Sequence, residues 1–129
     1  MKENDTVHVR AAVTPSVHNA AGLPPGFRDE RIAGGSDLPG QFQFNTPTTL
    51  AFLPDGGLLV TEKGGKLRLV KNNLVQPTAV LDLTAKVSPV GDGGLISVAV
   101  DPDFATHSFI YLIYTLWFAH FTGQLARLK

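Results

Sequence analysis

The amino-acid sequence predicts an all-β fold, and three observations lead to this expectation. Short apolar runs alternate with turns rich in Gly, Pro, Asp and Asn, which is typical of strands joined by tight connections. The chain contains 13 Gly and 9 Pro without the period of a collagen. With 129 residues, of which 43% are hydrophobic, it can also bury a core.

The first 22 residues show no sustained period of 2 or 3.6, so we expect residues 1–22 to form a flexible leader. Glu3, Asp5 and the lack of a continuous apolar run are unlike a secretory signal peptide. A first short strand is predicted over residues 27–33, followed by a loop over residues 34–40.

The central region is predicted to form a meander of four strands, because strong turn sequences separate its apolar runs. A Pro-Asp-Gly-Gly segment at residues 54–57 suits a turn, since Pro fixes φ and Gly accepts a positive φ. Gly64 and Gly65 are a hairpin signal, and the Asn-Asn pair at residues 72–73 tolerates a left-handed backbone. The four expected strands cover residues 48–53, 58–62, 67–70 and 79–83.

After a loop over residues 84–94, a second series of strands is predicted at residues 95–100 and 109–115, with residues 124–128 as an optional third strand. Residues 48–83 are close in length to the roughly 40 to 45 residues of one four-stranded propeller blade. The expected architecture is a β-propeller fragment with about one complete four-stranded blade and a partial second blade. Two blades cannot close a ring, so we expect self-association through the unclosed sheet.

Charge and composition exclude several classes of function. The 11 Lys and Arg residues balance the 11 Asp and Glu residues, so nothing attracts the phosphates of a nucleic acid or an anionic membrane surface. The absence of Cys excludes disulfides and thiolate chemistry. The sequence contains no nucleophile elbow, Walker phosphate loop or dinucleotide-binding fingerprint. The apolar run at residues 109–118 is far shorter than the roughly 20 residues that span a bilayer.

Four sequence motifs follow one another along the strands and turns described above. They are TPTTLAFLPDG at residues 46–56, LLVTEKGGKLR at residues 58–68, VLDL at residues 80–83 and GDGGLISVAVDPDFAT at residues 91–106. In this order they resemble the N-terminal part of the glucose/sorbosone dehydrogenase family of β-propeller proteins. The resemblance covers residues 23–115, and residues 116–129 are expected to be a divergent tail.

This resemblance implies a six-bladed propeller that holds pyrroloquinoline quinone (PQQ) and calcium and oxidises a sugar hydroxyl, with transfer of hydride to the quinone. In that family the catalytic His and most cofactor ligands lie beyond the matched part, so no catalytic or metal-binding residue is carried over. The isolated chain is therefore expected to be an inactive part of a carbohydrate oxidoreductase that binds neither PQQ nor calcium alone. Family members are usually periplasmic or secreted. A non-catalytic binding or assembly module on the same scaffold is the alternative.

One family position is carried over, the residue between two glycines that faces cofactor and substrate before an inner strand. Here it is Asp92, between Gly91 and Gly93, where the family typically has Gln or Glu. A carboxylate can accept a hydrogen bond from a sugar hydroxyl, and flanking glycines let the backbone approach a ligand. The chain also departs from the family at Ser97, where Gly is usual. The plainer interpretation is a tight turn that leads into a strand.

Other polar and aromatic residues have plain interpretations. Asp101 and Asp103 flank a proline and are expected to form a turn, since calcium needs six or more oxygen ligands. None of the four His residues has a partner at metal-ligand spacing. Glu62 and Lys63 cannot act on one substrate as an acid and a base, because adjacent strand residues point to opposite faces, and they are expected to be solvated charges at a strand end. An aromatic patch that lacks its neighbour is expected at Trp117, Phe118 and Phe121.

Overall fold

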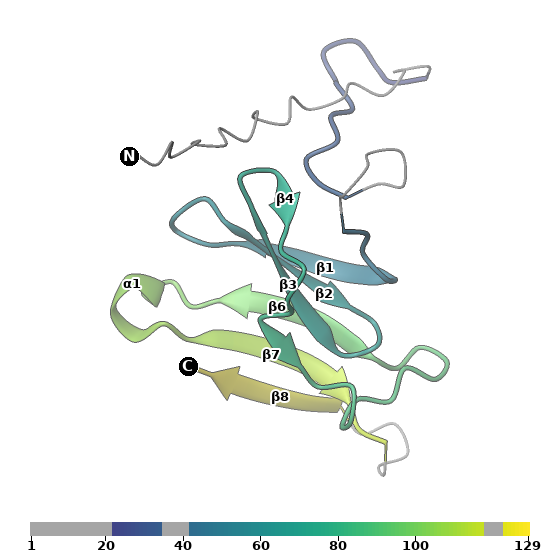
Figure 1. The fold of residues 1–129 in the computed structure, drawn as a ribbon, viewed down its shortest axis with the longest axis vertical. Coiled ribbons are helices and arrows are strands. Elements are labelled where there is room, and N and C mark those ends of the chain that lie inside the picture. The colour runs from purple at the N-terminus through teal and green to yellow at the C-terminus, as the bar shows by residue number, and fades with distance from the viewer. Residues whose placement is uncertain (1–21, 35–41, 118–122) are drawn as a thin grey trace, which may run out of the picture. The chain divides into compact units, whose positions relative to one another are not determined.

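The computed structural model describes residues 22–34, 42–117 and 123–129 (Figure 1). The chain divides into two compact units, Met1–Arg31 and Ile32–Lys129. Most of the expected leader lies outside the described residues. None of the described helices is long and apolar enough to cross a membrane.

The described part of the first unit is a turn and an extended segment. The amide of Phe27 donates a hydrogen bond to the carbonyl of Pro24 at 3.2 Å, which closes the turn. Among the described residues the predicted strand over residues 27–33 does not form, and Glu30 makes an isolated bridge instead. That prediction is wrong because residues 22–30 are exposed and have no apolar face to bury.

The first sheet confirms the predicted meander, shortens its fourth strand to two residues and adds a two-residue strand that was not predicted. Its strands are β1 (Pro47–Phe52), β2 (Leu58–Glu62), β3 (Lys66–Lys71), β4 (Leu74–Val75) and β5 (Leu81–Asp82). All pairs are antiparallel, and both β4 and β5 pair with β3, at opposite ends of that strand. Asn72 and Asn73 take positive φ values of 53° and 59°, so the chain turns back onto β3 at once and forms β4, which was not predicted.

The second sheet contains three antiparallel strands, β6 (Leu95–Val100), β7 (Ile110–Thr115) and β8 (Gly123–Leu128). The optional third strand of the sequence prediction is therefore present. Asp101 forms the predicted turn, because its Oδ1 accepts a hydrogen bond from the amide of Asp103 at 2.8 Å. The four-residue helix α1 (Phe104–His107), which was not predicted, follows this turn and leads into β7.

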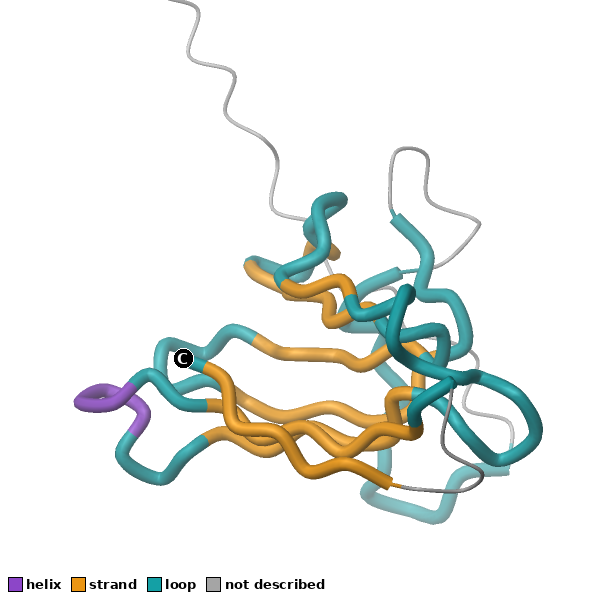
Figure 2. The backbone as a smooth tube through the Cα atoms, turned by 90° about the horizontal axis from the view of Figure 1, so that it is seen from below, coloured by secondary structure: helices purple, strands orange, loops and turns teal. Residues whose placement is uncertain are grey.

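The main core lies where the two sheets face each other. Alternation along the strands places one set of apolar side chains on the facing sides of the sheets. In Figure 2 the strands of this unit lie in stacked layers, and α1 lies within the β6–β7 connection. The buried residues of this core are Leu59, Leu67, Val87, Leu95, Val98, Leu112 and Tyr114.

The other face of the first sheet carries a smaller apolar cluster and a buried ion pair. Val60, Val70 and Val75 pack there against partly buried Phe42 and Phe44. We call this side of the sheet, which points away from the second sheet, its outward face.

Glu62 and Arg68 form the ion pair on this outward face. Arg68 Nε lies 3.2 Å from Glu62 Oε2, and their side chains are 7% and 4% exposed. The Arg68 guanidinium also lies 4.2 Å from the centre of the Phe42 ring and donates to the carbonyl of Pro77 at 2.9 Å. The expectation of a solvated Glu62 is wrong, because β3 and the segment before β1 cover it. Lys63, by contrast, is partly exposed.

Candidate functional site

The loop between β5 and β6 presents the residue that the sequence singled out. Asp92 is exposed at its tip, and Gly91 beside it takes a φ of 59° with open space around it. Gly93 is different, since a Cβ there would lie 2.7 Å from the carbonyl oxygen of Ser88 and from Thr115 Oγ1. The space at Gly93 is thus filled by the protein itself, whereas Gly91 leaves backbone open to an approaching ligand.

Thr115 at the end of β7 holds the loop from the second sheet. Its Oγ1 accepts a hydrogen bond from the amide of Gly94 and donates one to the carbonyl of Ser88, both at 2.8 Å. Its backbone bonds the same two residues, because the Ser88 amide donates to Thr115 O and the Thr115 amide donates to Gly94 O. Thr115 therefore bonds both ends of the segment 88–94, which contains Asp92.

Lys63, which follows β2, holds the same loop from the first sheet. Its Nζ donates a hydrogen bond to the carbonyl of Gly91 at 2.6 Å, and its own carbonyl accepts one from the amide of Leu95 at 3.0 Å. Nearby, the Thr48 hydroxyl donates to the carbonyl of Leu95 at 2.7 Å. The loop is thus attached to both sheets.

At the junction of the two sheets, the exposed Asp92 carboxylate lies on a loop whose backbone accepts a hydrogen bond from the Lys63 ammonium group. Such a pair offers acceptors and donors of hydrogen bonds, which suits a polyhydroxylated ligand. Reasoning from the sequence missed Lys63, because it treated that residue as a strand-end charge. No pattern in the sequence marks this contact, whereas the structure shows it at Gly94, where a Cβ would lie 2.6 Å from the Lys63 carbonyl oxygen.

The polar residues at the other end of β6 form a turn rather than a metal site. The Tyr111 hydroxyl donates to Asp101 Oδ2 at 2.6 Å. This bond, helped by the amide of Asp103, holds the pKa of Asp101 below its ordinary value, and it raises the pKa of Tyr111. His107 lies 3.7 Å from Asp103 and stacks on Phe109.

Metal ligands are not grouped in the described parts of the chain. No group of three or more His, Cys, Asp or Glu residues that could hold a metal ion occurs there. The other three His residues, and Phe118 and Phe121 of the expected aromatic patch, lie outside the described residues, whereas Trp117 is half exposed.

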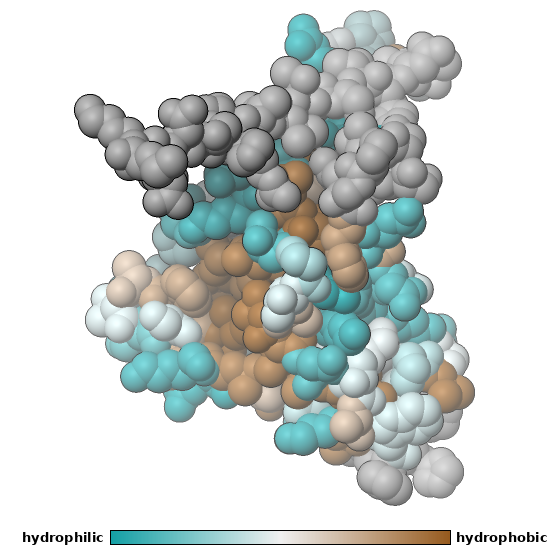
Figure 3. Space-filling view, in the orientation of Figure 1, coloured by the Kyte–Doolittle hydropathy of each residue, from teal (hydrophilic) through white to brown (hydrophobic). Residues whose placement is uncertain are grey.

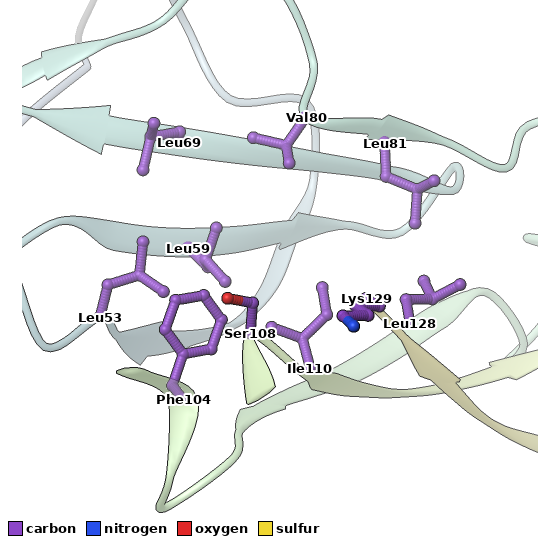
Figure 4. A pocket seen from close by; sticks show the side chains of 10 residues that line it. All are labelled: Leu53, Leu59, Leu69, Val80, Leu81, Phe104, Ser108, Ile110, Leu128 and Lys129. Atoms are coloured by element: carbon purple, nitrogen blue, oxygen red, sulfur yellow. The ribbon is translucent and has the colours of Figure 1, made fainter. Parts of the chain in front are cut away.

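An apolar cavity of about 400 Å³ lies between the sheets, away from Asp92. Figure 3 shows apolar side chains gathered between the two sheets near α1, and Figure 4 shows side chains from both sheets around the cavity. Lys129 and the Ser108 hydroxyl are its only side-chain polar groups among the described residues. The cavity therefore lacks the convergent polar groups that sugar recognition needs. Its lining residues are Leu53, Leu59, Leu69, Val80, Leu81, Phe104, Ser108, Ile110, Leu128 and Lys129.

Comparison with known proteins gives consistent similarities. The family model described as Glucose / Sorbosone dehydrogenase matches residues 44–128, which include β8. Aldose sugar dehydrogenase YliI of Escherichia coli is 40% identical over 79 residues, which are 58% of this chain and 20% of that protein. The chain spans about a fifth of the length of the curated relatives that it matches.

Solved structures extend this similarity to three dimensions. A candidate oxidoreductase (glucose dehydrogenase) of Thermus thermophilus superposes with a TM-score of 0.63 at 30% identity, covering 78% of this chain and 27% of that one. The PQQ-bound aldose sugar dehydrogenase of Streptomyces coelicolor gives a TM-score of 0.58 at 30% identity, covering 67% and 25%. With the unclosed antiparallel sheets, these matches confirm the predicted all-β propeller architecture of one blade and a partial second blade.

Proposed function

Because the chain belongs to the glucose/sorbosone dehydrogenase family, we propose that it contributes a sugar-contacting loop to a PQQ-dependent aldose dehydrogenase. The observation that supports this proposal is the exposed Asp92, held at the junction of two sheets by Thr115 and Lys63. The related enzymes named above act on aldose sugars, and one of them binds PQQ.

In this proposal the loop residues bind and orient the sugar. The Asp92 carboxylate accepts a hydrogen bond from a sugar hydroxyl. Gly91 leaves room for the sugar ring beside the backbone, since nothing lies within 4 Å of the position that a Cβ would take. The Lys63 ammonium donates a hydrogen bond to the Gly91 carbonyl and so fixes the backbone beside Asp92.

The described residues do not by themselves fit PQQ or calcium. PQQ carries carboxylates and needs several cationic or N–H donors, whereas the loop offers one ammonium group beside the carboxylate of Asp92. Calcium needs six or more oxygen ligands, and the described chain groups no such set. Both groups would have to be held by other parts of a complete propeller, and no catalytic step is assigned to the residues described here.

Two measurements test the proposal. Dye reduction by the purified chain with aldose, PQQ and calcium is expected to be absent, because no general base is assigned to the described loop. Robust quinone-dependent reduction would show that the chain is a complete catalyst and would overturn the expected inactivity.

Sugar binding is tested separately by titrating aldoses into the ¹⁵N-labelled chain. The amides of Gly91 and Asp92 are expected to shift, and the replacement Asp92→Ala is expected to abolish the response. Asp29→Ala is the matched control, since Asp29 is an exposed carboxylate of the other unit. Equal responses of the two variants would contradict a role for Asp92.

A non-catalytic binding or assembly module is the second candidate, because one propeller scaffold can host many unrelated functions. The coding sequence that follows the codon of Lys129 separates the two candidates. Further blade repeats with a His-bearing loop favour the dehydrogenase, whereas a stop codon favours the module.

A further inference from the structure

The loop that carries Asp92 is bonded on one side to Lys63 and on the other to Thr115. We infer that Lys63 and Thr115 are positioning residues, which together hold Asp92 in place for the sugar. This inference rests on the proposed function, since it assigns the two residues a role at the same loop. Neither residue is itself assigned a contact with the reacting atoms.

The Lys63 side chain fixes the backbone directly before Asp92. The carbonyl of Gly91 belongs to the planar peptide group that includes the Asp92 amide and ends at the Asp92 Cα. The 2.6 Å hydrogen bond from Lys63 Nζ to this oxygen therefore fixes the orientation of that whole group. Gly91 takes a left-handed φ and has no neighbour within 4 Å of a Cβ position, so its own packing does not restrain it.

Thr115 fixes the backbone after Asp92. Its hydroxyl oxygen accepts a hydrogen bond from the Gly94 amide, and the hydroxyl donates one to the carbonyl of Ser88, both at 2.8 Å. A valine of nearly the same shape would leave both backbone groups without this partner. The two attachments thus bracket Asp92, one residue before it and two residues after it.

The backbone contacts make the two attachments interdependent. The Lys63 carbonyl accepts the amide hydrogen bond of Leu95 at 3.0 Å, and Gly94 packs so closely that a Cβ there would lie 2.7 Å from the Lys63 Cγ. The Lys63 stem therefore packs on the same loop whose backbone its ammonium binds. The position of Asp92 consequently depends on the spacing between the two sheets.

The test measures amide hydrogen exchange by NMR without any ligand, in the wild type and in the variants Thr115→Val and Lys63→Met. Thr115→Val is expected to speed exchange of the Gly94 amide about tenfold, because its acceptor is lost. Lys63→Met keeps the packed stem and is expected to shift the Gly91 carbonyl and Asp92 amide resonances. Thr115→Ser and Lys63→Arg keep the polar groups and are expected to restore wild-type behaviour.

A local effect separates positioning from a general contribution to stability. The amides of Val98 and Leu112 lie in the core strands and are expected to keep their exchange rates in every variant. If exchange at these core amides rises together with that of Gly94, or if Gly94 does not respond, the inference is overturned.

A parallel aldose titration keeps this inference distinct from the proposed function. If the Asp92 amide of the wild type responds to sugar, both positioning variants are expected to weaken that response at least about tenfold, and an undiminished response overturns the inference. If the wild type does not respond to sugar while the variants still show the expected changes in amide exchange and chemical shift, the proposed function is contradicted. The attachment of the loop by Lys63 and Thr115 is then still supported.

Discussion

Each of the two sheets is an antiparallel meander, but they differ in how the face that points away from the other sheet is covered. On the first sheet, Phe42 and Phe44 pack over the valines of β2, β3 and β4. On the second sheet, Ile113 is 46% exposed and Leu125 is 70% exposed. The outer edges differ as well, because β4 and β5 line β3 whereas β8 has no such partner among the described strands.

This difference shows that short segments outside the three long strands complete the first sheet. The segment before β1 supplies the aromatic cover, and the short pieces β4 and β5 supply the edge pairing. The cover is also incomplete on the first sheet, since Leu50 and Phe52 of β1 are exposed on the same outward face as Val60. A meander alone therefore leaves apolar surface that needs a further layer.

The largest expected effect is a loss of stability when the buried ion pair on the outward face of the first sheet is broken. Arg68→Ala leaves Glu62 buried without its partner and removes the contact with the Phe42 ring, so we expect a loss of about 3–5 kcal/mol in the free energy of unfolding. Urea unfolding measures this loss. Lys71→Ala is the control, because Lys71 and Asp55 form a pair whose side chains are about half exposed, and about 1 kcal/mol or less is expected. Similar losses in both variants would contradict the importance of burial.

A second expected effect concerns the uncovered face of the second sheet. We propose that the isolated chain self-associates through this face, so its light-scattering mass should rise with concentration and Leu125→Lys should reduce the rise. Gln124→Lys adds the same charge to β8 on the opposite face and serves as the control. A wild-type mass that does not depend on concentration would exclude the association.

The smallest expected effect is a change in the pKa of Asp101, whose hydrogen-bond partner Tyr111 lies on β7 of the second sheet. Tyr111→Phe removes the main hydrogen bond that lowers the pKa of Asp101, so this pKa should rise toward the ordinary value of about 3.9. In the wild type the lowered pKa stabilises the fold above that value, and the contribution is lost as the pH falls through the folded-state pKa. Carboxyl ¹³C NMR measures the titration.

Asp55 provides the internal control for this titration. Its pKa is lowered mainly by the hydrogen bond from the Gly57 amide, which Tyr111 does not contact. A shift at Asp55 in the Tyr111→Phe variant would indicate a general change in the fold rather than the loss of one bond.

Local signals in the sequence were sufficient to locate most strands but not to identify the residues that contact them from other segments. Alternation and turn residues located β1, β2, β3, β5, β6 and β7, because both signals depend on neighbouring residues. The two-residue strand β4 has too few residues to show a period. Glu62 was misjudged because Arg68 and Phe42, which cover it, belong to other segments.

The candidate site divides in the same way. Asp92 and its glycines could be located from the resemblance, and their exposure on a loop agrees with either a ligand-facing position or a simple turn. The contact of Lys63 with Gly91 joins residues 28 positions apart, so no local pattern predicts it. Only the spatial neighbourhood of Gly94 shows why that position has no side chain.

The bond between Lys63 and Gly91 also implies an order of assembly. The β2–β3 hairpin closes over the short turn at Gly64 and Gly65, so it can form early, as local contacts do. The Asp92 loop must wait for Thr115, which lies 21 positions after Gly94. As a ribosome releases the chain from its N-terminus, residues 47–82 can pair while the loop still lacks its second anchor. The Asp92 loop is consequently expected to take its final conformation only after β7 has emerged.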